Sequence, residues 1–272
     1  MKRATTMKQF NNDLLAINPS NEKNRITSFI NNVLKKTGFE NVIIGMSGGV
    51  DSTTIFYLLK KVVPPENIFI AHLYYFDSHF KDIEPILKET KIPKENIYEI
   101  SIEPLTKAIQ SLLHLEGGRM DSFEVNRVRL GNIMARVRMI ILYDLAKKHN
   151  SLVCGTENRS EYLLGYFTRF GDQASDFEPI QHLYKTHVYE LASFLKVPKN
   201  IIDKEPTAGL WHGQTDEGEF GFTYQEADQV LFYYYDKKLG LGEIKKKGFK
   251  NAEKIIGFSL KNSYKHITPY IL

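Results

Sequence analysis

The sequence predicts an α/β protein with a parallel sheet that has helices on both faces, followed by a C-terminal helical extension. Short apolar runs bounded by turn residues alternate with segments of helical periodicity over most of the chain. This alternation is typical of parallel sheets, whose strands are buried on both faces. The last third of the chain carries helix signals only. A hydrophobic fraction of 42% across 272 residues is sufficient for a sizeable core.

The expected elements follow one another along the chain. Residues 1–22 form a lead-in, and a helix over 22–36 ends at Gly38, which tolerates the left-handed conformation of a helix cap. The apolar runs predict strands, and the periodic stretches between them predict helices. The expected strands are 42–46, 68–74, 97–102 and 151–155, and the expected helices between them are 52–62, 80–90 and 124–149.

Helix signals alone continue towards the C-terminus. Thr223 and Glu226 have the spacing of a capping box that begins a helix to about residue 239, with Gly240 as its stop. A further helix is expected over 251–260. We therefore predict a single domain, 1–272, built from an α/β core at about 22–205 and a lid loop with a helical extension at about 206–272.

Composition excludes several classes of function. The net charge of +4 suits an anionic ligand but is too small to indicate nucleic-acid binding. Cys154 is the only cysteine, which excludes an internal disulfide framework, and its apolar surroundings predict a buried structural thiol. No signal peptide is readable, and the longest apolar run, 139–143, is too short to cross a bilayer. We expect a cytoplasmic protein with no membrane or nucleic-acid partner.

The strongest functional signal is a glycine-rich loop between the first expected strand and the next helix. Its glycines let the backbone turn sharply, so that successive N–H groups and the helix N-terminus can face an anion. Asp51 suits phosphate only if a divalent cation lies between them. The alternative is a plain strand–helix turn in which Asp51 is an N-terminal helix charge. The residues of this phosphate loop are Gly45, Met46, Ser47, Gly48, Gly49, Val50, Asp51 and Ser52.

The phosphate loop is not a Walker A motif, because no lysine follows the glycines at the required position. It is not the dinucleotide fingerprint either, because the glycine spacing differs. The stretch Ser-Gly-Gly-Val-Asp-Ser resembles the loop of the N-type ATP pyrophosphatases, which cleave ATP between the α- and β-phosphates. That family includes NAD, GMP, asparagine and argininosuccinate synthetases and tRNA-modifying enzymes, and the loop alone does not choose among them.

Two further segments carry polar side chains at positions that suit a ligand. Arg129, Asn132 and Arg136 recur beside the apolar face of a helix and can present donors to an anion, although arginines reaching to solvent explain the same pattern. Thr156 follows the fourth expected strand, where it can bond a ligand. Glu161 can reach the metal of Asp51 if the first and fourth strands are adjacent; otherwise it is an exposed helix residue.

A long loop over 205–217 is rich in Pro, Gly and polar residues, which is typical of lids and binding loops. Thr207 in this loop and Lys185 before it can hold phosphates. Thr186 is expected to cap a helix over 187–195.

Together these segments resemble the NAD synthetase family over roughly residues 25–265. The matching pieces, in the order found in that family, are SGGVDS, GNIMARVRM, GTENRSEYLLGYFTRFGD, LYKT and PTAGLW followed by GQTDE. The resemblance implies a sheet like that of the adenine nucleotide alpha hydrolases. It also implies a homodimer with the dinucleotide at the subunit interface.

The resemblance implies a role for each matching residue. ATP would contact the phosphate loop, Thr156, Lys185 and Thr207, and Mg²⁺ would bind Asp51 and Glu161. Deamido-NAD would contact Arg136, Arg169, Asp176 and Lys265. The chain departs from the family at Arg169, where lysine is usual, at Gln173 and Ala174, where two glycines are common, and at Tyr264, where a histidine often precedes the lysine.

The expected reaction has two steps. The carboxylate of deamido-NAD attacks the α-phosphate of ATP, which gives an acyl-adenylate and pyrophosphate, and ammonia then displaces AMP to give NAD. Asp51 and Lys185 would act in the first step, in which the departing pyrophosphate must be neutralised. Asp172 is a candidate to take a proton from ammonium. Because no glutaminase segment is visible, we expect free ammonia to be the nitrogen donor.

Two other functions fit parts of the sequence. A tRNA-modifying enzyme with the same loop would need a basic, aromatic surface, which the net charge of +4 and the absence of CxxC pairs disfavour. A non-catalytic adenine-nucleotide-binding module would not need two carboxylates that reach a metal. A salt-dependent tRNA gel shift would favour the first function, and the absence of pyrophosphate release with any carboxylate substrate would favour the second.

Overall fold

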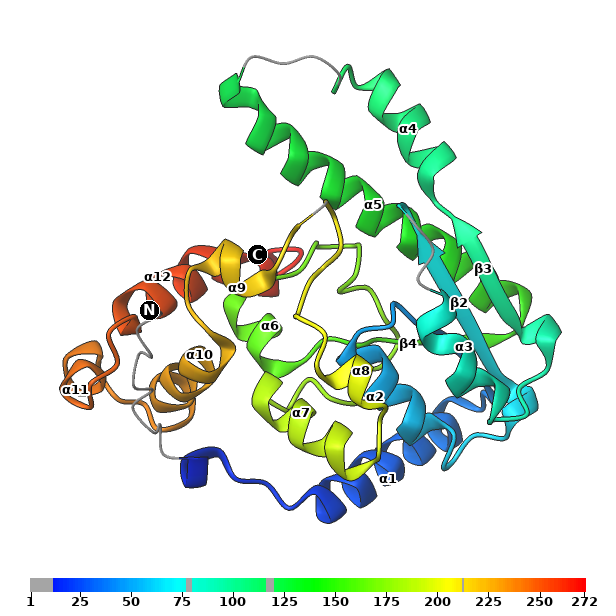
Figure 1. The fold of residues 1–272 in the computed structure, drawn as a ribbon, viewed down its shortest axis with the longest axis horizontal. Helices are drawn as coiled ribbons and strands as arrows, with labels where there is room; N and C mark the ends of the chain where they lie inside the picture. The colour runs from blue at the N-terminus through cyan, green and yellow to red at the C-terminus, as the bar shows by residue number, and fades with distance from the viewer. Residues whose placement is uncertain (1–11, 77–79, 116–119, 212) are drawn as a thin grey trace, which may run out of the picture.

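The computed structural model describes residues 12–76, 80–115, 120–211 and 213–272. Its centre is a four-stranded parallel sheet in the order β3-β2-β1-β4 (Figure 1). The predicted α/β class with a parallel sheet is confirmed, and each strand lies within one residue of its expected position. The strands are β1 (Asn41–Gly45), β2 (Ile68–Tyr74), β3 (Ile97–Ser101) and β4 (Ser151–Cys154).

Strand β1 lies between β2 and β4. Ile43 pairs with Phe69 of β2 on one side and with Val153 of β4 on the other. The chain leaves β1 towards β2 and β3 and returns to β4 on the opposite side, so the winding direction reverses between β1 and β4. Parallel sheets bind ligands beyond the carboxyl ends of their strands at such a reversal. The first and fourth strands are therefore adjacent, which is the condition for Asp51 and Glu161 to share a site.

Helices cover both faces of the sheet, as predicted. Helices α1 (Pro19–Thr37), α2 (Val50–Leu59) and α7 (Lys185–Phe194) pack on one face, around a core that includes Ile26, Ile44 and Leu191. Helix α5 (Met120–Lys148) covers the other face. Its Met134 and Val137 pack against the β1 and β4 side chains that point to that face.

Helix starts were predicted less accurately than strands. The helix expected over 22–36 begins at Pro19, because the Asn18 side chain accepts a hydrogen bond from the Asn21 N–H at 3.0 Å and proline suits the first helical position. Its predicted end is confirmed: Gly38 has φ 76°. The cap expected at Thr186 is wrong, since α7 begins two residues earlier, at Lys185, with Tyr184 as its N-cap.

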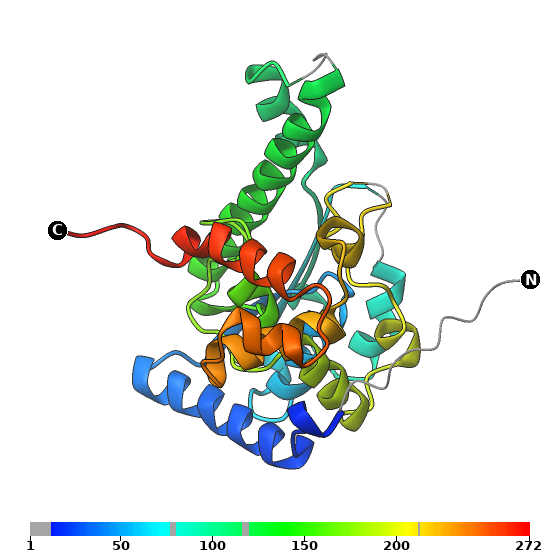
Figure 2. The same cartoon turned by 90° about the vertical axis from the view of Figure 1, so that its left-hand side faces the viewer.

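A helix pair extends beyond the sheet. Helix α4 (Glu103–Leu112), which was not predicted, packs against α5, and both reach away from the rest of the molecule (Figures 1 and 2). Large apolar side chains on this pair are exposed instead of buried. They are Leu105 and Leu112 of α4, and Val125, Val128 and Ile140 of α5.

The C-terminal extension has its own apolar cluster around Phe220, Leu231 and Ile255. That cluster includes Leu163 and Leu164 of α6 (Arg159–Leu164), so the extension packs directly on the helix that follows β4. The helix expected to reach residue 239 is shorter, because after α10 the chain makes one π-helical turn, η4 (Phe232–Asp236). The remaining helices are α3 (Phe80–Lys88), α6 (Arg159–Leu164), α8 (Lys199–Ile202), α9 (Asp216–Phe220), α10 (Tyr224–Leu231), α11 (Leu241–Lys246) and α12 (Ala252–Asn262). Within the described ranges, no helix is long and apolar enough to cross a membrane.

Candidate active site

The phosphate loop joins β1 to α2 at the carboxyl edge of the sheet. Gly48 has φ 79°, a left-handed conformation that glycine adopts without strain. The Ser47 hydroxyl accepts the Gly49 N–H at 3.2 Å and lies 3.3 Å from the Ser52 hydroxyl. The Met46 and Val50 side chains are buried. Any contact that these two residues make with phosphate therefore has to come from their backbone N–H groups, as expected for a nest at a helix N-terminus.

A buried cluster of two carboxylates and one ammonium lies beside the phosphate loop. Lys185 Nζ is 2.6 Å from Asp51 Oδ2 and 3.3 Å from Glu161 Oε1. The Lys185 side chain is 3% exposed, so solvent screens these ion pairs weakly. Burial opposes the charge on Lys185, but Asp51 and Glu161 together raise its pKa, so the ammonium stays protonated. The sequence predicted Lys185 as a phosphate contact and did not foresee this pairing.

The two carboxylates fit the Mg²⁺ site that the sequence suggested. They come from α2 and α6, and both face the point occupied by Lys185 Nζ. Burial raises the pKa of Glu161 to about 8, although the Lys185 ammonium opposes that effect. A divalent cation completed by phosphate oxygens would favour the charged form of both carboxylates. Across the described part of the chain there is no group of three or more histidine, cysteine or acidic side chains that could hold a metal. A metal held by this pair would therefore need further ligands from the substrate.

Asn158 joins the two sides of this cluster and was missed by the sequence analysis. Its side-chain N–H donates to Asp51 Oδ1 at 2.9 Å, and its Oδ1 accepts the Glu161 N–H at 3.0 Å as the N-cap of α6. The Glu161 side chain in turn accepts the Asn158 N–H, which completes a capping box. The capping-box spacing was readable in the sequence, but the contact with Asp51, 107 residues away, was not.

A second cation lies near the phosphate loop and was also missed. A side-chain carbon placed at Gly48 would be 4.0 Å from Lys204 Nζ, which itself lies 3.5 Å from an Asp82 carboxylate oxygen. Lys204 precedes the loop that the sequence predicts as a lid, and its ammonium lies close to the turn at Gly48.

Asp228 of the C-terminal extension positions the residues next to Glu161 and Lys185. Its carboxylate accepts hydrogen bonds from the Ser160 hydroxyl at 2.5 Å and the Thr186 N–H at 2.9 Å. Ser160 and Thr186 are the neighbours of Glu161 and Lys185, and the Ser160 hydroxyl also accepts the Lys185 N–H at 2.8 Å. A fully buried residue of α10 therefore fixes the first turns of both α6 and α7.

We expect Asp228→Asn to lower both stability and turnover. Asparagine can accept one of the two hydrogen bonds but not both, and leaving a buried donor unpaired costs about 1–3 kcal/mol. Thermal unfolding and kcat should both report the loss, because Glu161 and Lys185 lose their common support. An unchanged kcat in a measurably destabilised Asp228→Asn protein would contradict the positioning role.

The residues expected to contact deamido-NAD lie around the segment after α6. The Asp172 carboxylate accepts the Thr168 N–H at 2.9 Å, and desolvation by the surrounding protein raises the pKa of Asp172. Lys265 Nζ donates to the carbonyl oxygens of Gly165 and Phe167 at 2.6 and 3.0 Å. Burial lowers the pKa of Lys265, while Asp172 opposes that effect. Asp172 and Lys265 are thus brought together, although they are far apart in the sequence.

Other predicted dinucleotide contacts have structural partners of their own. The Asp176 carboxylate accepts the Val153 N–H of β4 at 2.7 Å. Arg136 donates to the Arg169 carbonyl at 3.3 Å. The Arg169 guanidinium lies 5.2 Å from the centre of the Tyr264 ring. Two departures from the family pattern therefore contact each other, and an arginine stacks on an aromatic ring better than a lysine does.

Comparison with known proteins shows the family of this chain. The NAD synthase family model matches residues 22–269. The chain belongs to the NAD synthase family. Among its relatives, an NH3-dependent NAD⁺ synthetase of Thermococcus kodakarensis is 44% identical over 79% of this chain and 80% of its own length. One from Fusobacterium nucleatum is 36% identical over 94% of this chain and 97% of its own length.

Solved structures show the same fold as this NAD synthase family member. An NMN synthetase from Francisella tularensis has a TM-score of 0.78 and 31% identity, with coverage of 94% of this chain and 99% of its own. An NH3-dependent NAD synthetase from Campylobacter jejuni has a TM-score of 0.75 and 28% identity, with coverage of 94% and 100%. The C-terminal extension is therefore shared with whole solved synthetases.

In this family member, the loop that the sequence predicts as a lid packs on α5. A side-chain carbon at Gly131 would lie 2.8 Å from Leu210, so the glycine allows the loop to approach the helix closely. Arg127 stacks on the Trp211 ring at 4.4 Å. Thr207, an expected ATP contact, accepts the Gly209 N–H at 3.0 Å, and no described contact brings it to the phosphate loop. Its ATP role stays a prediction.

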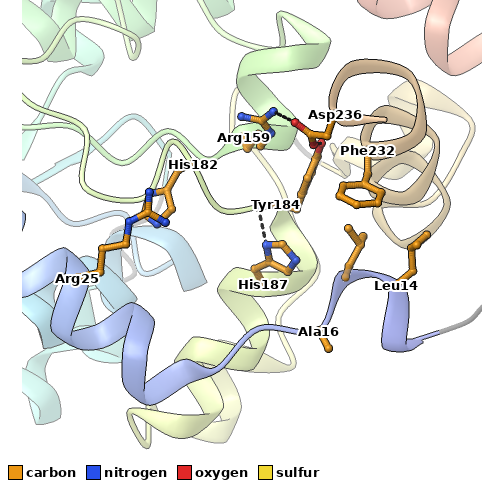
Figure 3. Close-up of a pocket in the computed structure, with 10 residues that line it drawn as sticks. Leu14, Ala16, Arg25, Arg159, His182, Tyr184, His187, Phe232 and Asp236 are labelled. Carbon is orange, nitrogen blue, oxygen red and sulfur yellow. Dashed lines mark hydrogen bonds and ion pairs between the residues drawn. The ribbon is translucent and has the colours of Figure 1, made fainter. Parts of the chain in front are cut away.

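Two remaining features lie outside the clusters described above. Cys154 is buried, as predicted, and burial raises the pKa of its thiol, which makes it a poor nucleophile. A pocket of about 340 Å³ opens between η1 (Asn12–Leu15), α7 and η4 (Figure 3). In it Asp236 already pairs with Arg159 and with the Tyr184 hydroxyl. These contacts of Asp236 hold Arg159 and Tyr184, the residues next to Asn158 and Lys185.

Proposed function

We propose that this chain amidates deamido-NAD with ammonia at the expense of ATP, releasing NAD, AMP and pyrophosphate. The observation that carries the proposal is the convergence of Asp51, Asn158, Glu161 and Lys185 beside the phosphate loop. That convergence supplies acidic metal ligands and a cation where the β- and γ-phosphates of ATP would lie. Membership of the NAD synthase family and relatives named as NH3-dependent NAD⁺ synthetases support the substrate.

The first step would form an acyl-adenylate. The substrate carboxylate is the nucleophile, so the protein has to hold the two reactants and neutralise pyrophosphate as it leaves. The N–H groups of the phosphate loop and the Lys185 ammonium serve the second purpose. Asp51 and Glu161 would hold Mg²⁺, which supplies further charge neutralisation when bound.

The second step would use free ammonia. Cys154, the only cysteine, is buried and unreactive, so it cannot serve as the thiol nucleophile of a glutaminase. Asp172 interacts with Lys265 and has a raised pKa, which suits a group that exchanges a proton with ammonium. Arg136, Arg169, Asp176 and Lys265 would hold the dinucleotide.

The protein would act as a homodimer. Helices α4 and α5 extend away from the sheet and expose Leu112, Val125 and Ile140, which are 77%, 60% and 54% exposed. Exposed apolar side chains gathered on one projecting helix pair are typical of a protein–protein interface. Sedimentation equilibrium measures this directly, and a monomer at assay concentrations would contradict it. Residues 1–272 would form a single domain. The part after about residue 205 would provide the lid and, through Asp228, the hydrogen bonds that position α6 and α7.

The function is tested by mixing the protein with ATP, Mg²⁺, ammonium and deamido-NAD and following NAD and AMP by mass spectrometry. We expect both products in equal amounts and none when any reactant is omitted. Nicotinate mononucleotide should be tested in parallel, because the structure is also similar to an NMN synthetase. Higher kcat/KM with the mononucleotide would make that compound the substrate. Glutamine supporting turnover as well as ammonium would contradict the nitrogen donor.

A further inference from the structure

A buried glutamate next to the cluster has no assigned role. Glu157 lies between Thr156 and Asn158, just beyond the carboxyl end of β4, and is 5% exposed. Its Oε2 accepts a hydrogen bond from the Gln181 side chain at 2.8 Å. Its Oε1 is buried and has no hydrogen-bond partner among the residues that the structure describes. A buried acceptor without a donor is costly, so this oxygen is suited to a ligand that donates.

A second buried carboxyl fixes the position of Glu157. Glu178 Oε2 accepts the Glu157 N–H at 3.1 Å, and Glu178 Oε1 accepts the Ser175 hydroxyl at 2.7 Å. A side-chain carbon at Gly155 would lie 1.8 Å from Glu178 Oε1, so the glycine is required for this arrangement. The main chain before Asn158 is thereby tied to the segment that contains Asp172.

The surroundings of Glu157 are rich in acids. Burial raises the pKa of Glu157 to about 9; the Gln181 hydrogen bond opposes this effect, and the carboxylates of Glu178, Glu161 and Asp172 add to it. Two lysine ammonium groups of the candidate site are engaged elsewhere, with Lys185 paired to Asp51 and Glu161 and Lys265 bonded to backbone carbonyls. The group around Glu157 therefore has a surplus of acceptors over positive donors.

We propose that Glu157 binds the ammonium ion that provides the amide nitrogen, with Glu178 holding it in place. The proposal rests on the proposed function. Ammonium is a small cation that donates hydrogen bonds in four directions, and Glu157 Oε1 is an acceptor that lacks a donor. A bound ammonium favours the carboxylate form of Glu157 that burial disfavours. Loss of the ammonium proton to the Glu157 carboxylate, in place of Asp172, leaves neutral ammonia and a neutral carboxyl. A carboxyl with a raised pKa makes that exchange less unfavourable than an ordinary carboxylate would.

The test is Glu157→Gln, which keeps the size of the side chain and removes the charge. We expect KM for ammonium to rise about tenfold or more, as befits the loss of a charged hydrogen bond. KM for ATP and for deamido-NAD should change little. Pyrophosphate release from ATP and deamido-NAD without ammonium should also continue at the wild-type rate. Glu226→Gln is the matched control, because Glu226 is also buried but accepts its hydrogen bonds from Asn251 in the extension.

Each other outcome would overturn the assignment. An unchanged KM for ammonium would show that Glu157 is structural. Equal loss of pyrophosphate release would place Glu157 in the first step. Failure of the wild-type protein to release pyrophosphate would instead contradict the proposed function. A measurement on the wild-type protein guards against misfolding of the variant: ammonium chloride should raise Tm more than sodium chloride at equal concentration, and equal shifts would reject the site.

Discussion

Asp51→Asn is expected to lower kcat by about 100-fold or more and to raise the Mg²⁺ concentration needed for half-maximal activity. The substitution removes a charge without changing the size of the side chain. Asparagine can still accept the hydrogen bond from the Asn158 side chain, which should keep the loop in place. The lost interactions are those with Lys185 and with the proposed metal ion. Steady-state NAD formation at saturating ATP across a Mg²⁺ titration measures both effects.

A control for this substitution is available on the surface. Asp203 pairs with Lys199 one helical turn away, and both side chains are exposed. Asp203→Asn removes an acidic charge of the same kind from an exposed pair, and exposed pairs of this type contribute little to stability. It should leave kcat and the Mg²⁺ dependence unchanged. If Asp51→Asn kept a near-normal kcat at saturating Mg²⁺, the proposed metal site would be wrong.

Lys185→Met is expected to reduce kcat as strongly, by about 100-fold or more, but to act on Mg²⁺ in the opposite direction. The ammonium lies between Asp51 and Glu161, so its removal leaves two carboxylates facing each other without a cation. Like charges in a buried site favour either protonation or binding of another cation. Apparent affinity for Mg²⁺ should therefore increase while the chemical step, which needs the ammonium against pyrophosphate, slows.

Lys185→Arg tests whether charge alone is sufficient. A guanidinium keeps the positive charge but is planar and larger than an ammonium, and the Lys185 side chain is almost fully buried. We expect it to fold less stably and to recover little of the activity. Mg²⁺ binding, measured by calorimetry in the presence of a non-hydrolysable ATP analogue, separates the two effects. Weaker Mg²⁺ binding in Lys185→Met would show that the ammonium does not compete with the metal.

The sequence was sufficient for the elements whose signals are local. The strands were placed within one residue because each is a short apolar run bounded by turn residues, and Gly38 ended its helix as expected. Helix α4 was missed because it is short and its apolar Leu105 and Leu112 are exposed, so no buried face marked it. Helix α10 is shorter than predicted because a π-helical turn follows it, and no residue type predicts such a turn.

The candidate site was predicted in its parts but not in its connections. Asp51, Glu161 and Lys185 were each singled out, but 134 residues separate Lys185 from Asp51, and only the sheet order brings them together. Lys185 was interpreted as a phosphate ligand because a sequence does not show what a lysine faces. The supports Asn158 and Asp228 were missed for the same reason, since their partners are distant in the chain.

The carboxylate of Asp228 has a consequence for how far this enzyme can be trimmed. Although α10 belongs to the part of the chain that carries no strand, it supplies the only described side chain that contacts both Ser160 and Thr186. A fragment that stopped before α10 would retain the residues of the sheet and of the phosphate loop. Glu161 and Lys185 would then lie at the starts of two helices that no longer share the Asp228 hydrogen bonds. The C-terminal extension thus fixes the relative positions of α6 and α7 at the candidate site.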